Sequence, residues 1–386
     1  MEKNKNNIKI LTDYGFFRWQ KMGGISRYHY ELIKGLKSKG YKIDIGVKFN
    51  KNYYLEEILG KVLYISKIKS LDIFLNAFNK LYNIYLLKKN KYSYFHPSSN
   101  SEYYLNYLEE TKLIVTIHDM IDEKLESIFL SEVKNKIEYY QKIGKIWDYK
   151  KNIEARKKNI FLSKKIIAIS KNTKKDILEL YPEIDPDKIE VIYHGNSLEK
   201  YKLENYSNRK EDKKYILYVG ARNFLHKNFE NFIYGISRIL LEKDMYLICI
   251  GGGKFSPEEN IMLKKLEINE RVFQENVNDD KLIEAYKGAE IFVSPSLYEG
   301  FGMPLVEAMY CNCPMAISNT SCYPEIAEEG AIYFNPYNRD EIYEQCKKLI
   351  ENQELRKRIK INQKERIKFF NWEETVEKTL QVYLKA

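Results

Sequence analysis

The sequence predicts an α/β protein built from two doubly wound parallel domains. Short apolar runs of strand length alternate with stretches of helical periodicity, which is typical of a parallel sheet with helices on both faces. The alternation stops over residues 196–213 and then starts again. A chain of 386 residues is long enough for two domains of ordinary size.

The first half opens with a strand, a glycine-rich loop and a helix. Residues 8–12 are apolar, Gly23 and Gly24 lie in the loop, and the amphipathic stretch 26–39 ends at Gly40. Further apolar runs of strand length lie at residues 43–47, 113–117, 166–169 and 189–193. We therefore expect residues 1–195 to form an N-terminal Rossmann-like domain.

The second half repeats this pattern after a polar stretch. Residues 196–213 lose all apolar periodicity and are the predicted linker. Apolar runs then follow at residues 215–220, 245–250, 271–273, 291–293 and 315–317. Residues 214–370 should form the second Rossmann-like domain, and ligands should bind where its strands end.

Composition and charge exclude several classes of protein. The hydrophobic and charged fractions, 44% and 31%, exclude a disordered or collagen-like chain. No apolar run is long enough to span a membrane, and the first seven residues lack the apolar stretch of a secretory signal, so we expect a cytoplasmic location. The five cysteines show no zinc spacing and are predicted to be reduced core residues.

The positive charge is confined to the first half. Residues 1–195 hold 36 Lys and Arg against 24 Asp and Glu, whereas residues 196–386 hold 28 against 30. Clustered cations attract nucleic acids, anionic lipids or phosphorylated ligands. A genome rich in A and T would raise the lysine content everywhere and would not by itself explain the asymmetry.

A predicted helix at residues 71–90 has two interpretations. Its polar residues at positions 72, 76, 79 and 83 leave a broad apolar face, and lysines lie nearby. The helix could rest on an anionic membrane surface, or it could pack on its own sheet.

The most informative segment runs from Ser294 to Met309. Gly300 and Gly302 allow a ligand close to the backbone, and Pro304 suits the first turn of a helix. A helix N-terminus behind a glycine-rich loop is a phosphate site. Glu299 in the loop and Glu307 in the helix could bind hydroxyl groups of the same ligand. The alternative is that Glu299 caps the helix and Glu307 is solvated.

A second segment, residues 219–228, also follows a strand and places Arg222 and Lys227 in one loop. Two cations beside a helix N-terminus can hold a diphosphate and stabilise it as a leaving group. Asp185 and Asp187 are interpreted as a turn rather than a metal motif. The histidines at positions 29, 96, 194 and 226 are scattered along the sequence without metal-ligand spacing, so no metal site is predicted.

These segments resemble the retaining, nucleotide-sugar-dependent glycosyltransferases of family four. This family has the GT-B fold, in which two Rossmann-like domains face a cleft. The resemblance covers nearly the whole chain and is carried by Glu299 with Glu307, Arg222 with Lys227, residues 23–28, His118 with Asp119, and residues 371–373. It implies that a C-terminal helix at about 371–386 packs back on the first, acceptor-side domain.

The resemblance also implies roles for individual residues. Glu307 would bind the ribose hydroxyls, and Arg222 and Lys227 the diphosphate. Glu299 and the amides of Phe301, Gly302 and Met303 would bind the donor sugar. The loop of Gly23 and Gly24 would approach the β-phosphate, and the backbone near Gly253 and Val277 would read the nucleobase. His118 would lie near the donor sugar and Asp119 near the acceptor, where Asp119 is either the base or an orienting group.

The predicted function is therefore transfer of a hexose, with retention of configuration, from a nucleoside diphosphate sugar to a saccharide or lipid-linked acceptor. The nearest resemblance is to bacterial enzymes that build capsule, O-antigen or lipopolysaccharide, and mannose from GDP-mannose is the first candidate donor. No cofactor, metal or nucleic acid is expected, and the enzyme could lie on the inner face of the cytoplasmic membrane. The alternatives are a UDP-sugar-dependent transferase or epimerase of the same fold, and a basic module that binds membranes or nucleic acid.

Overall fold

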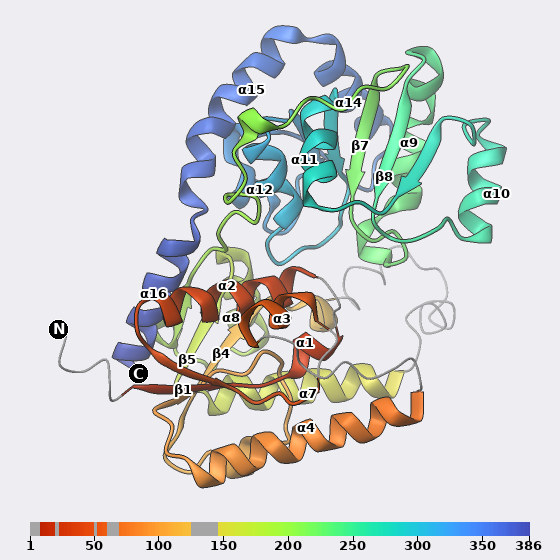
Figure 1. Cartoon of the computed structure of the whole chain (residues 1–386). Coiled ribbons are helices and arrows are strands. Elements are labelled where there is room, and N and C mark those ends of the chain that lie inside the picture. The colour runs from red at the N-terminus through yellow and green to blue at the C-terminus, as the bar shows by residue number, and fades with distance from the viewer. Residues whose placement is uncertain (1–7, 20–22, 50–51, 60–68, 125–145) are drawn as a thin grey trace. The chain divides into compact units, whose positions relative to one another are not determined.

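The computed structural model describes residues 8–19, 23–49, 52–59, 69–124 and 146–386 (Figure 1). The chain divides into two compact units, one formed by Met1–His194 with Trp372–Ala386 and the other by Gly195–Asn371. Each unit contains a six-stranded sheet whose described strand pairs are all parallel. The α/β class with two doubly wound sheets is thereby confirmed.

The sheet of the first unit has the strand order β2-β1-β3-β4-β5-β6. Its strands are β1 (Lys9–Thr12), β2 (Lys42–Ile45), β3 (Tyr94–Phe95), β4 (Lys112–Ile117), β5 (Lys165–Ala168) and β6 (Ile189–Val191). Its helices are α1 (Gly15–Trp19), α2 (Gly24–Ser38), α3 (Tyr53–Leu59), α4 (Lys69–Lys89), α7 (Ile146–Leu162), α8 (Lys171–Leu180) and α16 (Trp372–Lys385). Strand β3 was not predicted, because a strand of two residues gives no alternation to detect.

The sheet of the second unit has the order β12-β11-β10-β7-β8-β9. Its strands are β7 (Tyr215–Val219), β8 (Tyr246–Ile250), β9 (Val272–Glu275), β10 (Ile291–Ser294), β11 (Met315–Ser318) and β12 (Ile332–Phe334). Its helices are α9 (Phe229–Glu242), α10 (Pro257–Lys265), α11 (Asp279–Gly288), α12 (Met303–Tyr310), α13 (Tyr323–Ala327), α14 (Arg339–Glu351) and α15 (Gln353–Arg366). The strand order changes direction between β7 and β10, and ligands of such sheets bind at the carboxyl ends of the strands at this point.

Residues 196–213, the predicted linker, are tied to the second unit. The Tyr206 hydroxyl donates to Asp280 at 2.7 Å, and the Arg209 guanidinium donates to both carboxylate oxygens of Glu275 at 2.7 and 2.8 Å. Lys287 donates to the carbonyl oxygen of Leu203 at 2.8 Å. Residues 196–213 lack apolar periodicity, and these polar contacts hold the segment against α11 and β9.

The C-terminal helix α16 belongs to the first unit, where it packs on α2. Gly35 permits this packing, because a Cβ atom there would come within 2.5 Å of the Val376 side chain. The Thr375 hydroxyl also donates to the carbonyl oxygen of Tyr193 at 2.7 Å.

The described parts of the chain show two further features. All five cysteines are buried and unpaired. No helix among the described residues is long and apolar enough to cross a membrane.

Candidate functional site

The loop between β10 and α12 has a fixed shape. Gly302 precedes α12 with φ of 84°, a left-handed conformation that favours glycine, and a Cβ atom there would lie 2.8 Å from the ring of Tyr323. The backbone N–H of Glu299 donates to the Ser321 hydroxyl at 3.1 Å, and that hydroxyl donates to the carbonyl oxygen of Glu299. Gly302, the N-cap residue of α12, has no side chain with which to cap the helix. The positive end of this helix is therefore available to an anion.

Glu299 and Lys227 form an ion pair within the second unit. The Lys227 Nζ lies 2.5 Å from Glu299 Oε1, and the two side chains are 22% and 17% exposed. The Ser296 hydroxyl also donates to Oε1, at 2.8 Å. Burial opposes ionisation of Glu299, but the Lys227 ammonium outweighs it and, with His226, lowers the pKa of Glu299 below its ordinary value. Glu299 is therefore a carboxylate at neutral pH. The described hydrogen-bond partners of its side chain are Lys227, Ser296 and Tyr323, not the backbone of α12.

The loops that carry this pair follow neighbouring strands of the sheet. β7 and β10 are paired, with Ile216 opposite Ile291. The backbone N–H of Leu297 donates to the carbonyl oxygen of His226 at 2.7 Å, and the Asn228 amide donates to the carbonyl oxygen of Pro295 at 3.2 Å. The parallel register thus brings together two charges that lie 72 positions apart in the sequence.

Glu307 lies on α12 and is buried rather than solvated. Its Oε1 accepts a hydrogen bond from the Ser197 hydroxyl at 2.6 Å, and its Oε2 accepts one from the Tyr286 hydroxyl at 3.3 Å. Burial and the neighbouring Glu307 raise the pKa of Tyr286 well above its ordinary value, so the phenol keeps its proton and remains a donor. Ser197 could not be predicted as a partner of Glu307, because nothing in its surroundings in the sequence distinguishes it.

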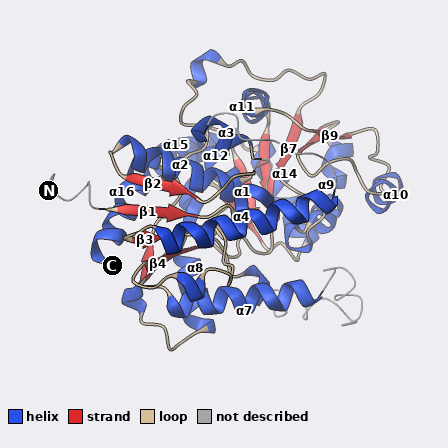
Figure 2. Ribbon diagram, turned by 60° about the horizontal axis from the view of Figure 1, so that its bottom comes forward, coloured by secondary structure: helices blue, strands red, loops and turns tan. Residues whose placement is uncertain are grey.

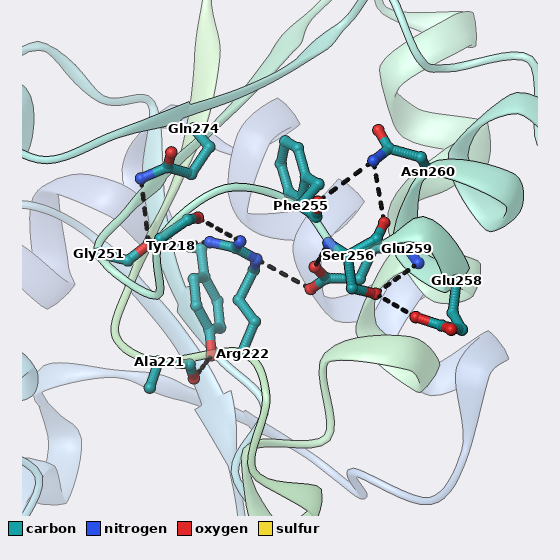
Figure 3. Close-up of polar contacts among 11 residues, drawn as sticks. Tyr218, Ala221, Arg222, Gly251, Phe255, Ser256, Glu258, Glu259, Asn260 and Gln274 are labelled. Atoms are coloured by element: carbon teal, nitrogen blue, oxygen red, sulfur yellow. Dashed lines mark hydrogen bonds and ion pairs between the residues drawn. The ribbon is translucent and has the colours of Figure 1, made fainter. Parts of the chain in front are cut away.

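Arg222 holds the glycine loop after β8 (Figure 3). Its side chain is 1% exposed, and it donates to the carbonyl oxygens of Gly251 and Gly253 at 2.8 and 2.7 Å. Its Nε donates to Glu259 at 3.0 Å, and its guanidinium lies 4.4 Å from the centre of the Phe255 ring. Arg222 therefore shapes this loop, whereas direct contact of Arg222 with a diphosphate remains a prediction.

The remaining donor-site candidates of the second unit lie in the loops after β8, β9 and β10. Gly251, Gly252 and Gly253 all have positive φ, of 89°, 74° and 72°. Val277 lies between β9 and α11 and is half-buried. Gly300 and Phe301 are buried in the loop that precedes α12, and Met303 is the first residue of that helix. Their backbone contacts with a donor remain predictions.

In the first unit, His118 and Asp119 follow β4 directly. Both ring nitrogens of His118 are buried and have no hydrogen-bond partner among the described residues. Burial, with the neighbouring His194, His96 and Arg156, lowers the pKa of His118 well below its ordinary value, so the ring is neutral. The Asp119 carboxylate accepts a hydrogen bond from the N–H of Ile121 at 3.2 Å, which orients it in its loop.

Gly23 and Gly24 form the start of α2. Gly23 has an extended backbone with φ of 176°, and α2 begins at Gly24. The Ser26 hydroxyl donates back to the carbonyl oxygen of Gly23 at 3.0 Å. No described side chain caps this helix, so its N-terminus also suits a phosphate group.

The structure corrects the interpretation of His29, His96 and His194 as scattered, because they gather with His118, whereas His226 lies in the second unit. The His118 ring centre lies 5.7 Å from those of both His29 and His194, and the His29 centre lies 5.7 Å from that of His96. Tyr28 packs against three of these rings. No local pattern in the sequence predicts this cluster, because His29, His96, His118 and His194 lie in or just after different elements. Among the described residues, no group of three or more His, Cys, Asp or Glu side chains could hold a metal ion.

Two known families match consecutive parts of the chain. The family described as "Glycosyltransferase Family 4" matches residues 22–200, and "Glycosyl transferases group 1" matches residues 199–366.

Two curated relatives and one solved structure illustrate the similarity. The O-antigen chain mannosyltransferase RfbU of Salmonella typhimurium is 33% identical over 174 residues, which cover 45% of this chain and 47% of RfbU. An uncharacterized glycosyltransferase of Methanocaldococcus jannaschii is 30% identical over 293 residues, which cover 71% of this chain and 68% of that protein. Anabaena HepE, solved with UDP and glucose, has a TM-score of 0.71 at 15% identity and covers 98% of this chain and 100% of its own.

The matches to the first curated relatives span only about half of their length. The two family matches nevertheless meet near residue 200 and together cover most of the chain, and the M. jannaschii relative aligns over more than two thirds of its own length. The chain therefore belongs to the glycosyltransferases of family four, with a group 1 domain in its second half, and has the GT-B fold.

Proposed function

We propose that this protein is a retaining hexosyltransferase that uses a nucleoside diphosphate sugar to extend a saccharide of a surface polysaccharide. The observation that carries the proposal is the Lys227–Glu299 pair beside the uncapped N-terminus of α12, at the strand ends where β7 and β10 meet. A cation next to a helix N-terminus suits a diphosphate, and a nearby carboxylate suits sugar hydroxyls.

Leaving-group stabilisation is the proposed source of much of the rate. As the glycosidic bond to the diphosphate breaks, negative charge builds on the leaving phosphate oxygen. Lys227 and the positive end of α12 would stabilise this charge in a partly buried site, where one such donor contributes about 3–4 kcal/mol. Glu307 would accept hydrogen bonds from the ribose hydroxyls, and Arg222 would act by holding the loop of Gly251 and Gly253 in shape.

The first unit would supply the contacts to the reacting sugar and to the acceptor. The neutral ring of His118 offers one donor and one acceptor nitrogen, and neither is used by a described neighbour. We propose that His118 binds a hydroxyl group of the donor sugar and that Asp119 binds the acceptor hydroxyl. Gly23 and Gly24, at the uncapped start of α2, would approach the β-phosphate.

GDP-mannose is the proposed donor, and an O-antigen, capsule or lipopolysaccharide saccharide is the proposed acceptor. The support is that RfbU is an O-antigen chain mannosyltransferase. A UDP-sugar is the second candidate, because HepE shares the fold and was solved with UDP. We further propose that the chemistry needs no metal ion and that the acceptor is reached at a membrane surface.

A thermal-shift panel with GDP, UDP, CDP and ADP tests the donor class, because a ligand that binds only the folded state raises the melting temperature. We expect a selective shift with GDP. Turnover with GDP-mannose, measured as GDP release, and NMR of the product would then test the sugar and the retained configuration. A folded protein that none of the four diphosphates stabilises would contradict the proposed donor site.

A further inference from the structure

Helix α4 buries two of its polar side chains. Asn79 and Asn83 are among the most buried residues of the first unit. The Asn79 amide oxygen accepts from the N–H groups of Lys48 and Phe49 at 2.9 and 3.1 Å, and its amide nitrogen donates to the carbonyl oxygen of Phe49 at 2.9 Å. Asn83 donates to the carbonyl oxygen of Gly46. The two asparagines therefore provide hydrogen-bond partners for backbone N–H and C=O groups of the loop that follows β2.

The opposite face of α4 is apolar and exposed. Phe74, Phe78, Leu81 and Tyr85 are 65%, 43%, 65% and 50% exposed. At about 100° per residue they fall within an arc of about 60°, so they form one stripe along the helix. Figure 2 shows α4 on the outside of the first unit, running along its sheet. The buried face of α4 also carries Leu75, Leu86 and Leu87, so the helix has apolar side chains on both its buried and its exposed face.

Lysines extend and border this stripe. Lys88 continues it by one turn, and Lys89 lies beside it at the end of the helix. Both side chains are exposed. The unit that carries the helix holds 36 basic against 24 acidic residues up to position 195.

We infer that this face of α4, defined by Phe74, Phe78, Leu81, Tyr85 and Lys88, docks on an anionic lipid bilayer. An exposed apolar stripe of this kind marks an interaction surface. A helix that lies in the membrane interface inserts its apolar face between the headgroups, while its lysines pair with the anionic lipids.

The charge favours a bilayer over a second copy of the chain. A symmetric dimer through α4 would bring two basic units together and would leave the lysines facing like charges. An anionic bilayer would instead bury the apolar stripe and pair the lysines with anionic headgroups.

Co-sedimentation with vesicles tests the inference, using full-length protein with phosphatidylcholine vesicles and with vesicles that also contain phosphatidylglycerol. We expect binding to the anionic vesicles that salt weakens, and little binding to pure phosphatidylcholine. Phe74→Ser with Phe78→Ser should weaken binding at least about tenfold. Lys88→Gln with Lys89→Gln should weaken it about 25-fold, since each lysine near the surface contributes about fivefold.

Matched controls lie on the second unit. Ile261→Ser with Ile361→Ser removes two apolar side chains that are 67% and 63% exposed. Lys264→Gln with Lys265→Gln removes two exposed lysines from the last turn of α10. Both control variants should bind the anionic vesicles like the wild type.

Three results would overturn the inference. The first is wild-type protein that stays in solution with anionic vesicles at low salt. The second is equal loss of binding in the controls and in the α4 variants. The third is a dimer, detected by analytical ultracentrifugation, that Phe74→Ser and Phe78→Ser dissociate while vesicle binding persists. Sugar transfer to a water-soluble acceptor should be unchanged in the α4 variants, so these results are separable from the proposed catalytic function.

Discussion

Replacing Lys227 by methionine should affect stability and turnover for different reasons. The substitution keeps most of the length of the side chain but leaves Glu299 as a carboxylate that is only 17% exposed and has lost its cation. Breaking a fully buried ion pair costs about 3–5 kcal/mol, and the partial exposure of this pair reduces the expected loss to about 2–3 kcal/mol. For a unit of this size the melting temperature should fall by about 4–12 °C.

A double variant separates the two effects. Lys227→Met with Glu299→Gln removes both charges, so it should melt within about 3 °C of the wild type. Its turnover should nevertheless remain about 10²- to 10³-fold low, because the leaving diphosphate still lacks its cation. The stability loss of the single variant should also shrink as the pH is lowered, because protonation of Glu299 removes the unpaired charge.

Differential scanning calorimetry and nucleotide release measure both quantities on the same samples. Lys281→Met is the control, since Lys281 forms an exposed pair with Glu284 at 2.7 Å and should change stability by less than about 1 kcal/mol. A Lys227→Met variant that melts like the wild type would refute the argument about the buried pair. A double variant that regains turnover would show that Lys227 serves only to neutralise Glu299.

Three further predictions follow from single sites. Glu307→Gln should weaken binding of the nucleoside diphosphate by about 10- to 100-fold, measured by calorimetric titration, because a hydrogen bond to a charged group is lost; unchanged affinity would exclude the ribose role. Gly302→Ala should lower stability by about 2 kcal/mol or more, whereas Gly40→Ala, also at positive φ but in open space, should cost only about 1–2 kcal/mol; urea unfolding compares them. Burial lowers the pKa of His96 and His194 to about 3, so the first unit should lose stability as the pH falls from 6.5, by about 1.4 kcal/mol per pH unit for each histidine; His96→Asn should reduce that slope in urea unfolding, and an unchanged slope would contradict the assignment.

The sign of the pH effect follows from the linkage between proton binding and folding. The folded first unit keeps these histidines neutral, whereas the unfolded chain binds protons below the ordinary histidine pKa of about 6.5. The stabilising contribution is therefore present above that pH and is lost as the pH falls toward 3.

The sequence by itself determined the alternation of strands and helices and the loops that carry chemistry. Alternation is a local signal, because a buried strand needs a continuous apolar run and a covering helix needs a period of 3.6 residues. Glu299 and Lys227 could be selected because each follows a strand, and a parallel sheet brings such loops to one edge. Glycines at positions that require positive φ, such as Gly302, are likewise a local requirement.

Only the tertiary structure decided how these side chains are used. Arg222 holds the Gly251–Gly253 loop because its guanidinium reaches the carbonyl oxygens of Gly251 and Gly253 from the loop after β7. The four histidines meet because the ends of β3, β4 and β6 and the first turns of α2 lie together in the first unit. Helix α4 buries Asn79 and Asn83 because the loop after β2 leaves backbone groups that need partners. These contacts form between segments that are distant in sequence, so no local pattern of hydrophobicity predicts them.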